Sequence, residues 1–495
     1  MSRIIIQNGN LCELDLPLKF AQKLYNEFAI RHPNAFYLRT RQRGMQNWDG
    51  KIHYITKTGQ FKIGLLPKVY DMCIEMGIKP KVVDMRQPLP KVSKVVTNIG
   101  KYKLRPEQEK AVKAVINNKI GNTPFHIGVL DYTVNAGKTL IMSSLYLSYK
   151  KQLKTLLITN DSDWLNQARE EFKQYLPGED ITFVQGKVLN WSNFTIGMVQ
   201  SISRNMRFYQ KELSQIDMVL VDEADQGGSK QYQNVITRLF NTRIRIGLSG
   251  TIYMSKLAKD KVKNMNLECF FGKVLAEFKL KDSIKKGYST KTVVKMVPGK
   301  PWYGNWESDC ISYKEIYDDS ITLNKYARKM AYARLRWNIN QGRYPALVVC
   351  KHIAHCENLY KFFKKKLGDA YNIAYVHVNT PSKLRQQIMK DFREGKIDIL
   401  VSTTIIARGK NFPKLKYLLN TASMDSQEKS IQFLGRLVRT DESKNKVYLD
   451  DLHYPGNYLD RHGKHRKQYY QRQELKVILL DKLWKKHPNH SLIKS

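Results

Sequence analysis

The feature that most restricts the fold is a pattern of short apolar runs that alternate with helical segments. From about residue 100 onward these runs lie at 155–158, 195–199, 218–221 and 244–248, and the pattern begins again at 346–349, 375–378 and 397–401. Strands that are almost continuously apolar and separated by helices are typical of parallel sheets covered on both faces. We therefore predict an α/β fold with two tandem parallel-sheet lobes.

Two smaller parts flank these lobes. Residues 1–95 combine amphipathic helices, which begin after Pro17 and at Pro67, with short strands at 36–38 and 51–55, so we expect a separate α+β domain. The region 461–495 carries ten Lys or Arg against two Asp or Glu, which predicts a basic amphipathic helix that packs, binds DNA or does both. We place the boundaries at 1–95 for an accessory DNA-binding domain, 100–285 for the first lobe, 286–455 for the second lobe and 456–495 for a basic helical extension, with the connection between the lobes near 280–310.

The charge balance indicates a polyanionic partner. Lys and Arg number 84 against 44 Asp and Glu, a formal net charge of +40. This excess is typical of proteins that bind nucleic acid, although solubility or attraction to an anionic membrane gives the same sign. No apolar run has the length of a membrane span or a signal peptide, and the six cysteines show no paired spacing. We expect a cytoplasmic protein that binds nucleic acid and no membrane.

One loop has the composition of a phosphate-binding loop. An apolar strand at 125–130 precedes a five-residue segment that opens a helix: Asn135, Ala136, Gly137, Lys138 and Thr139. In this context the N–H groups of the helix N-terminus receive phosphates, Lys138 adds a positive charge and Thr139 ligates Mg²⁺. The first Gly of the common pattern would fall at Tyr132, so a chance match is the alternative interpretation. The segment predicts a site for ATP and Mg²⁺.

A pair of carboxylates follows the strand at 218–221. Asp222 and Glu223 come at the carboxyl end of that strand, where parallel sheets place their ligands. We expect Asp222 to hold magnesium, and Glu223 to orient and deprotonate an attacking water. An acidic surface turn is the alternative, but the order Asp222, Glu223, Ala224, Asp225 downstream of a phosphate loop disfavours it.

The second lobe supplies a further charged group near its end. Gln432, Arg436 and Arg439 fall on neighbouring turns of one helix face. Two guanidinium groups aimed at another lobe's phosphate site would act as arginine fingers, which stabilise charge on a transferring phosphoryl group. Taken alone, this spacing is usually that of a solvated helix face, so the interpretation depends on the other motifs.

Together these segments resemble the superfamily 2 helicases over most of residues 100–455. The resemblance implies two RecA-like lobes, an adenine-recognition segment that includes Arg105 and Gln108, and a coupling motif at 248–251. It also implies a fifth motif that runs from Ser402 to Gly409, and a sixth that contains Gln432, Arg436 and Arg439. The residues that it implies to contact the nucleic-acid backbone are Thr159, Gln167, Gln200, Ser201, Thr403 and Thr404.

Within that superfamily the chain is most similar to the phage UvsW-type recombination helicases. The similarity rests on the segment 47–52, on Ala136-Gly137-Lys138 after a loop without Gly, and on Lys351-His352. It implies ATP-dependent remodelling of branched DNA. We expect a monomer in the cytoplasm, and in the cytoplasm of a bacterial host if the chain is phage-encoded. The segment 222–225 spells the DEAD-box tetrapeptide, but the segment 248–251 is not Ser-Ala-Thr, so an RNA substrate is disfavoured.

Some groups are open to two interpretations. Arg41 and Lys51 beside Trp48 would form a basic patch with a stacking aromatic, or a core Trp beside solvated charges. For the aromatics Trp302 and Trp306 we favour packing. The Cys and His residues of 350–356 offer four metal ligands, but a strand followed by a helix would scatter them over several faces, so we favour a structural role.

Two other functional classes remain open at this stage. A double-strand translocase that never separates strands would carry the same ATPase motifs. A nucleic-acid-binding scaffold with a decayed ATPase is disfavoured because Lys138, Glu223 and Arg436 are all present.

Overall fold

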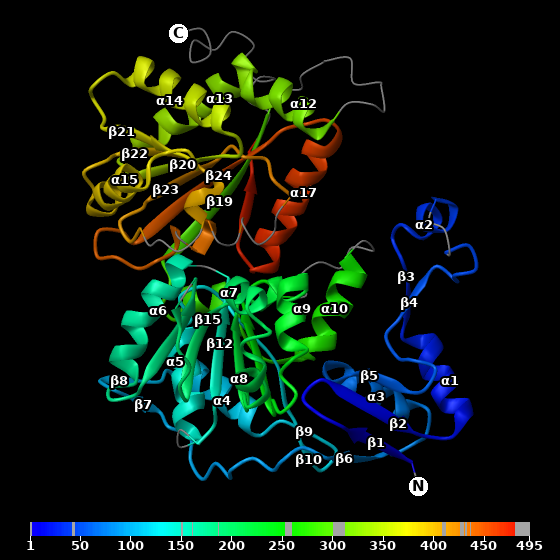
Figure 1. Cartoon of the computed structure of the whole chain (residues 1–495). Coiled ribbons are helices and arrows are strands. Elements are labelled where there is room, and N and C mark those ends of the chain that lie inside the picture. The colour runs from blue at the N-terminus through cyan, green and yellow to red at the C-terminus, as the bar shows by residue number, and fades with distance from the viewer. Residues whose placement is uncertain are drawn as a thin grey trace. The chain divides into compact units, whose positions relative to one another are not determined.

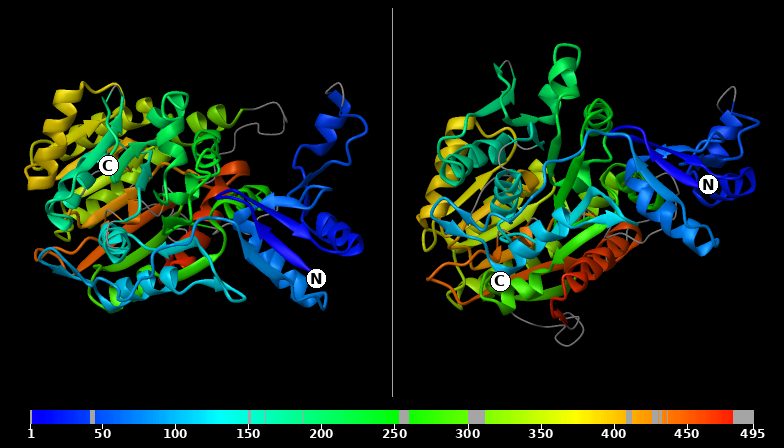
Figure 2. Two further views of the ribbon diagram at one scale, coloured as in Figure 1. Left: turned by 60° about the horizontal axis from the view of Figure 1, so that its bottom comes forward. Right: turned by 90° about the horizontal axis from the view of Figure 1, so that it is seen from below.

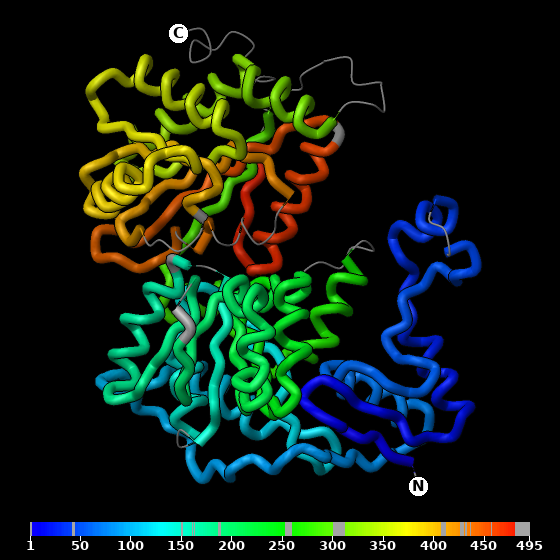
Figure 3. Tube along the Cα trace, in the orientation of Figure 1, coloured from blue at the N-terminus to red at the C-terminus, as the bar shows by residue number. Residues whose placement is uncertain are grey.

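The computed structural model describes residues 2–41, 45–149, 152–160, 162–186, 188–252, 260–299, 312–407, 412–425, 430, 433–435 and 437–480. The chain divides into two compact units, Met1–Phe278 and Lys279–Ser495. Figures 1 and 3 show the elements of each unit, and we describe the units one at a time.

The N-terminal part of unit 1 is built on a four-stranded sheet. Its order is β5-β2-β1-β6, with β1 antiparallel to β2 and parallel to β6. Alternate residues of β1 and β2, such as Ile4, Ile6 and Cys12, are fully buried, and helices α1 and α3 supply Leu24 and Val69 to the same core. The elements are β1 (Arg3–Ile6), β2 (Leu11–Asp15), α1 (Leu18–Glu27), β5 (Gln60–Lys62), α3 (Leu66–Glu75) and β6 (Lys81–Asp84).

A small hairpin and one helix extend from this sheet. Strands β3 (Ala29–Arg31) and β4 (Lys51–His53) pair antiparallel, and α2 (Ala35–Arg41) follows β3 in the sequence. This helix lies away from the four-stranded sheet in Figure 1 and in the left view of Figure 2. The prediction of a strand at 36–38 was therefore wrong. Phe36 is 80% exposed and Tyr37 56% exposed, so no buried face selects the extended form, and an apolar run this short is compatible with either structure.

The first α/β lobe follows in unit 1 as an eight-stranded sheet. Its order is β14-β13-β15-β12-β16-β17-β11-β18, and all strands except β14 are parallel. The strands are β11 (His126–Tyr132), β12 (Thr155–Thr159), β13 (Ile181–Gln185), β14 (Val188–Leu189), β15 (Phe194–Met198), β16 (Met218–Asp222), β17 (Ile244–Ser249) and β18 (Val274–Phe278). The helices are α4 (Pro106–Ile116), α5 (Lys138–Ser148), α6 (Ser162–Tyr175), α7 (Val199–Arg204), α8 (Gln210–Ser214), α9 (Lys230–Ile236) and α10 (Lys261–Phe271).

The N-terminal part and this lobe share one hydrophobic core, although we expected the N-terminal part to be a separate domain. Arg245, the second residue of β17, has no exposed surface and donates hydrogen bonds to the carbonyl oxygen of Gly9 and to Oδ1 of Asn10 (2.9 Å). Burial lowers the pKa of this guanidinium to about 9. A Cβ on Gly9 would lie 2.5 Å from the carbonyl oxygen of Leu239, so only glycine fits at this joint.

Unit 2 contains the second lobe, a seven-stranded parallel sheet of order β21-β22-β20-β23-β24-β19-β25. Its strands are β19 (Lys291–Pro298), β20 (Ala346–Cys350), β21 (Ile373–Val376), β22 (Ile399–Thr403), β23 (Tyr417–Asn420), β24 (Lys446–His453) and β25 (Val477–Leu479). Its helices include α11 (Leu280–Lys285), α12 (Tyr313–Tyr317), α13 (Lys325–Ile339), α14 (Ile353–Leu367), α15 (Ser382–Glu394) and α17 (Asn457–Arg472). The two parallel-sheet lobes confirm the predicted α/β fold class. The described part of the region 280–310, which was expected to hold the connection, contains helix α11 and the sheet strand β19.

The C-terminal extension packs onto unit 2. In α17 the guanidinium of Arg466 donates to both oxygens of Asp451 at 2.8–3.0 Å, and neither side chain is exposed. Tyr470 adds a hydrogen bond to Asp451 (2.7 Å), and β25 then pairs with β19. The predicted basic helix is thus part of the lobe. Within the described ranges, no helix has the length and apolarity needed to cross a bilayer.

Candidate functional site

The phosphate-loop segment connects β11 to the N-terminus of α5. Asn135 and Gly137 adopt left-handed backbone conformations, with φ of 62° and 71°, and Gly137 is the residue that caps α5. Asn is among the few residues with a side chain that tolerate this conformation, which explains how the loop turns without the usual glycine. Tyr132 is the last residue of β11 and lies outside the turn, where its hydroxyl donates to the carbonyl oxygen of Glu107 (2.7 Å).

The segment 105–108 donates hydrogen bonds to the backbone of the phosphate loop. Gln108 is buried, and its Nε2 donates to the carbonyl oxygen of Ala136 (2.9 Å) while its Oε1 accepts from the backbone N–H of Arg105 (2.8 Å). The guanidinium of Arg105 reaches the carbonyl oxygen of Asn135 (3.5 Å). The amide nitrogen of Gln108 therefore contacts the phosphate loop, while its oxygen binds the start of α4, and recognition of adenine by this residue stays a prediction.

Asp222 and Glu223 lie at the same edge of the sheet. Asp222 is the last residue of β16, and β17 separates that strand from β11, so the carboxyl ends of all three strands meet at one edge. Glu223 has a left-handed backbone, with φ 53° and ψ 49°. An oxygen ligand from Asp222 and the hydroxyl of Thr139 form the hard donor set that Mg²⁺ prefers, so these residues suit the predicted ion.

A buried tyrosine lies beside these carboxylates. Tyr232 of α9 is 1% exposed, and burial raises the pKa of its phenol, to which the charges of Glu223, Asp222 and Asp225 add. The hydroxyl has no hydrogen-bond partner among the described residues and stays protonated. Sequence reasoning missed Tyr232, because its position on a helix after the acidic segment carries no motif.

The coupling motif contacts the acidic segment directly. Ser249, at the end of β17, donates its hydroxyl proton to Oδ1 of Asp225 (2.7 Å) and accepts from the backbone N–H of Thr251 (3.1 Å). The segment 248–251, which the resemblance singled out, is thus held against the residues that follow Glu223.

Two residues that the sequence did not single out connect the expected nucleic-acid segments to this site. Nδ2 of Asn160, just after Thr159 at the end of β12, donates to Oε1 of Gln226, the residue that follows Asp225. Nε2 of Gln200 donates to the carbonyl oxygen of Asn160 (3.3 Å). The only signal in the sequence was their placement beside predicted residues.

The remaining predicted nucleic-acid residues of unit 1 have local partners. Nε2 of Gln167 donates to Glu171 (2.5 Å) within α6, and the hydroxyl of Ser201 accepts from the N–H of Gly186 (2.9 Å). The structure brings Gln200 to Asn160, whereas the hydrogen bond of Gln167 is to Glu171 within its own helix.

In unit 2 the structure places only part of the predicted set. Thr403 ends β22, and Thr404 opens the short helical turn after it, at the carboxyl edge of the second sheet. The carbonyl oxygen of Arg439 accepts from the hydroxyl of Thr290 (3.0 Å), which fixes this backbone beside β19. Gly409, Gln432 and Arg436 lie outside the described residues, as do Trp302 and Trp306.

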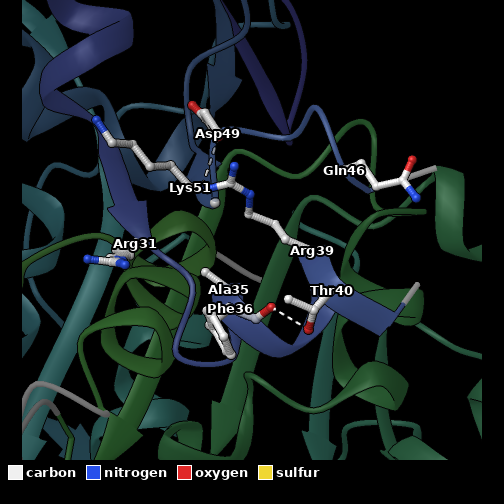
Figure 4. A pocket seen from close by; sticks show the side chains of 9 residues that line it. Arg31, Ala35, Phe36, Arg39, Thr40, Gln46, Asp49 and Lys51 are labelled. Atoms are coloured by element: carbon white, nitrogen blue, oxygen red, sulfur yellow. Dashed lines mark hydrogen bonds between the residues drawn. The ribbon is translucent and has the colours of Figure 1, made fainter. Parts of the chain in front are cut away.

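The basic residues of the N-terminal hairpin surround a pocket of about 530 Å³ (Figure 4). Its lining includes Arg31, Arg39 and Lys51, with Asp49 as a carboxylate. The indole N–H of Trp48 donates to the carbonyl oxygen of Lys51 (2.9 Å), so the ring supports the turn that carries this lysine. Arg41 lies over the ring of Tyr37, 5.1 Å from its centre.

In the segment 350–356 the thiols of Cys350 and Cys356 lie beside each other, whereas His352 and His355 both pack against Tyr317. Cys350 ends β20, whereas Cys356 lies in α14. Nδ1 of His355 pairs with the hydroxyl of Tyr317 (3.0 Å), and burial lowers the pKa of this imidazole to about 3. Within the described residues, no group of three or more His, Cys, Asp or Glu is arranged to hold a metal ion.

Comparison with known protein families now gives this site its context. Residues 101–254 match the family described as type III restriction enzyme, res subunit, and residues 330–441 match the helicase conserved C-terminal domain. Together the two segments cover more than half of the chain. The chain belongs to the superfamily 2 helicases. The helicase is therefore an ATP-hydrolysing enzyme, as its motifs predicted.

Individual relatives agree with this assignment. The chain is 21% identical over 474 residues to the ATP-dependent DNA helicase uvsW of Enterobacteria phage T4, across 88% of this helicase and 90% of that protein. It is 24% identical over 377 residues to a Saccharomyces cerevisiae protein named as the ATP-dependent helicase IRC3, across 70% of this chain but only 51% of the relative.

A solved structure also shares the fold. The ATP-dependent type ISP restriction-modification enzyme LlaBIII, bound to DNA, superposes with a TM-score of 0.57 at 15% identity, over 81% of this chain and 33% of that one. At this identity the likeness concerns the fold alone.

Proposed function

We propose that this helicase is a DNA-dependent ATPase that remodels branched DNA by branch migration, fork regression, unwinding or annealing. The observation that carries the proposal is the meeting of three motifs at one sheet edge: the phosphate loop, the acidic segment and the coupling motif. The phage T4 relative, which bears the name DNA helicase and aligns over nearly its whole length, supports DNA as the substrate.

The proposed chemistry assigns one role to each group. Lys138 and the N-terminus of α5 bind the phosphates, Thr139 and Asp222 hold Mg²⁺, and Glu223 takes the proton of the attacking water. Mg²⁺, when bound, would neutralise the charge that develops on the phosphates. Arg436 and Arg439 are proposed to stabilise the transferring phosphoryl group.

The structure also suggests how DNA binding could affect hydrolysis. Gln200 and Thr159 belong to segments proposed to contact DNA, and Asn160 connects these segments to Gln226. A shift of the bound backbone would thus act on the turn that carries Asp225. The basic pocket of the N-terminal hairpin, with Lys51, Arg41 and Trp48, is proposed as an additional contact with DNA phosphates.

ATPase assays with and without DNA test the active site. Lys138→Ala and Glu223→Gln should abolish DNA-stimulated ATP hydrolysis while DNA binding survives. Normal turnover in either variant would overturn the assignment of these residues.

The substrate needs a separate experiment. Four-way-junction and strand-displacement assays, run with and without ATP and with matched RNA strands, should show ATP-dependent remodelling of junction DNA. Translocation on duplex DNA without any strand separation would favour the double-strand translocase, and activity confined to RNA would contradict a DNA substrate.

A further inference from the structure

Unit 2 carries a cluster of cations around a partly exposed tryptophan. Trp337 lies in the last turn of α13, and 42% of its surface is exposed. Three cations lie over its ring: Nζ of Lys295 at 4.8 Å from the ring centre, and the guanidinium carbons of Arg343 at 4.7 Å and of Arg334 at 5.0 Å. Three positive charges thus converge on one indole.

A second aromatic ring extends the cluster. The guanidinium of Arg343 also lies over Tyr448, 3.6 Å from the ring centre, and Nζ of Lys446 lies 5.8 Å from the same centre. We refer to Lys295, Trp337, Arg343, Lys446 and Tyr448 as the Trp337 patch.

The charges of the Trp337 patch are not balanced by nearby carboxylates. Asp450 is buried and already bonded, since it accepts from Arg334 (2.8 Å), Asn338 (3.1 Å) and Tyr417 (3.0 Å). Among the described residues, no carboxylate lies within ion-pair distance of Lys295, Arg343 or Lys446. Burial lowers the pKa of the Lys295 ammonium, and the neighbouring Arg334, Arg343 and Lys446 lower it further against the opposing effect of Asp450. Cations gathered in this way favour an anion beside them.

The Trp337 patch lies at the amino edge of the second sheet. Lys446 is the first residue of β24, Arg343 precedes β20, and Trp337 lies in the last turn of α13. Tyr448 and Lys295 follow within β24 and β19, so the patch runs from the amino edge onto the adjoining face. Thr403, by contrast, lies at the carboxyl end of β22, a strand parallel to these. The Trp337 patch is therefore distinct from every motif that the proposed function uses.

We propose that the Trp337 patch is a second binding site for single-stranded nucleic acid, in which a base stacks on Trp337 and the backbone phosphates contact Arg343, Lys446 and Lys295. A partly exposed indole surrounded by cations fits this ligand, because every base has a π-face and every nucleotide a phosphate. An acidic peptide would use the cations but not the ring. This inference rests on the proposed function and adds a contact on the opposite edge of the lobe.

Binding of a fluorescein-labelled dT20 strand to the full chain tests the proposal. Trp337→Ala should weaken binding about tenfold, since stacking on an aromatic side chain contributes on that scale. Lys446→Ala should lower the slope of log K against log salt by about 0.7, the loss of one phosphate contact on a single strand. The matched control is Arg336→Ala, which removes an exposed charge from the same helix beside Trp337 and should leave binding unchanged.

Two further variants separate stacking from folding. Trp337→Phe keeps a ring and should retain most of the affinity, whereas Trp337→Leu fills the space without a π-face and should bind as weakly as Trp337→Ala. Equal affinity of the Phe and Leu variants, or wild-type affinity in the Ala variant, would overturn the proposal. The same would follow if poly-glutamate bound the wild-type chain and lost affinity in these variants while dT20 did not.

Nucleic-acid binding and ATPase activity of the wild-type chain distinguish a failure of the proposed function from a failure of the Trp337 patch. If wild type binds neither dT20 nor the matching RNA strand and shows no nucleic-acid-stimulated ATPase, the proposed function fails. If wild type binds and hydrolyses ATP but the patch variants behave like wild type, only the Trp337 patch fails. Equal losses on dT20 and on RNA of the same sequence would assign the patch to nucleic acid in general.

Discussion

Glu223 combines a proposed chemical role with a strained backbone, and the two can be tested separately. Its φ of 53° and ψ of 49° lie in the left-handed region, which costs a residue with a side chain about 1–2 kcal/mol. Glycine escapes this cost but loses about 0.5–1 kcal/mol more conformational entropy on folding than alanine does. The difference predicts that Glu223→Gly is more stable than Glu223→Ala by about 0.5–1 kcal/mol.

The pair of variants isolates the backbone, because both lack the carboxylate and every contact that the side chain makes. Urea unfolding should place the midpoint of Glu223→Gly above that of Glu223→Ala, the reverse of their order in a helix interior. DNA-stimulated ATPase should fall by about 10²- to 10⁴-fold in both variants, since a general base contributes on that scale. A lower midpoint for the Gly variant would refute the strain argument, and turnover near wild type in either variant would refute the role as base.

Three further predictions concern stability and ligand affinity. Gln108→Ala removes one hydrogen bond to the phosphate loop at Ala136 and one to Arg105, so ATP affinity measured by titration should fall about tenfold, and an unchanged affinity would contradict this role. Burial holds the pKa of His355 near 3, below its unfolded value, so the stability that depends on its neutral form is fully present above about pH 6.5 and is lost as the pH falls. The free energy of unfolding at pH 5 should therefore be about 2 kcal/mol lower than at neutral pH. His355→Phe should abolish this loss. Arg466→Met leaves Asp451 charged and buried, so unit 2 should lose about 3–5 kcal/mol in chemical denaturation, and a loss below about 1 kcal/mol would contradict the buried pair.

The sequence predicted the sheets well because their signal is local. Fully buried strands such as β16 and β20 read as continuous apolar runs, and their alternation with helices leaves few other folds. The family resemblance was confirmed for the same reason, since its motifs follow directly after such strands.

The errors lie where burial depends on distant contacts. The exposed Phe36 in α2 and the strand β25 have short patterns that tertiary packing decides. The core shared with the N-terminal part could not be predicted either. In the sequence Arg245 is an isolated charge on an apolar strand, and its partners Gly9 and Asn10 lie more than 200 residues away along the chain.

In the candidate site, too, some features could be predicted from the sequence and others could not. The identities of the residues in the phosphate loop and of Asp222 and Glu223 were readable from spacing, and their roles stay predictions that the variants above test. The link from Asn160 to Gln226 was not readable, because a hydrogen bond between two amides leaves no pattern in a single sequence.

The position of β19 has a consequence for synthesis of the chain. This strand is the first of unit 2 to be made, yet it pairs only with β24 and β25. At about 5–20 residues per second, β24 leaves the ribosome roughly 7–30 s after β19, and until then both edges of an apolar strand lack partners. In the first lobe the corresponding interval is shorter, because β11 is followed sooner along the chain by its partner β17.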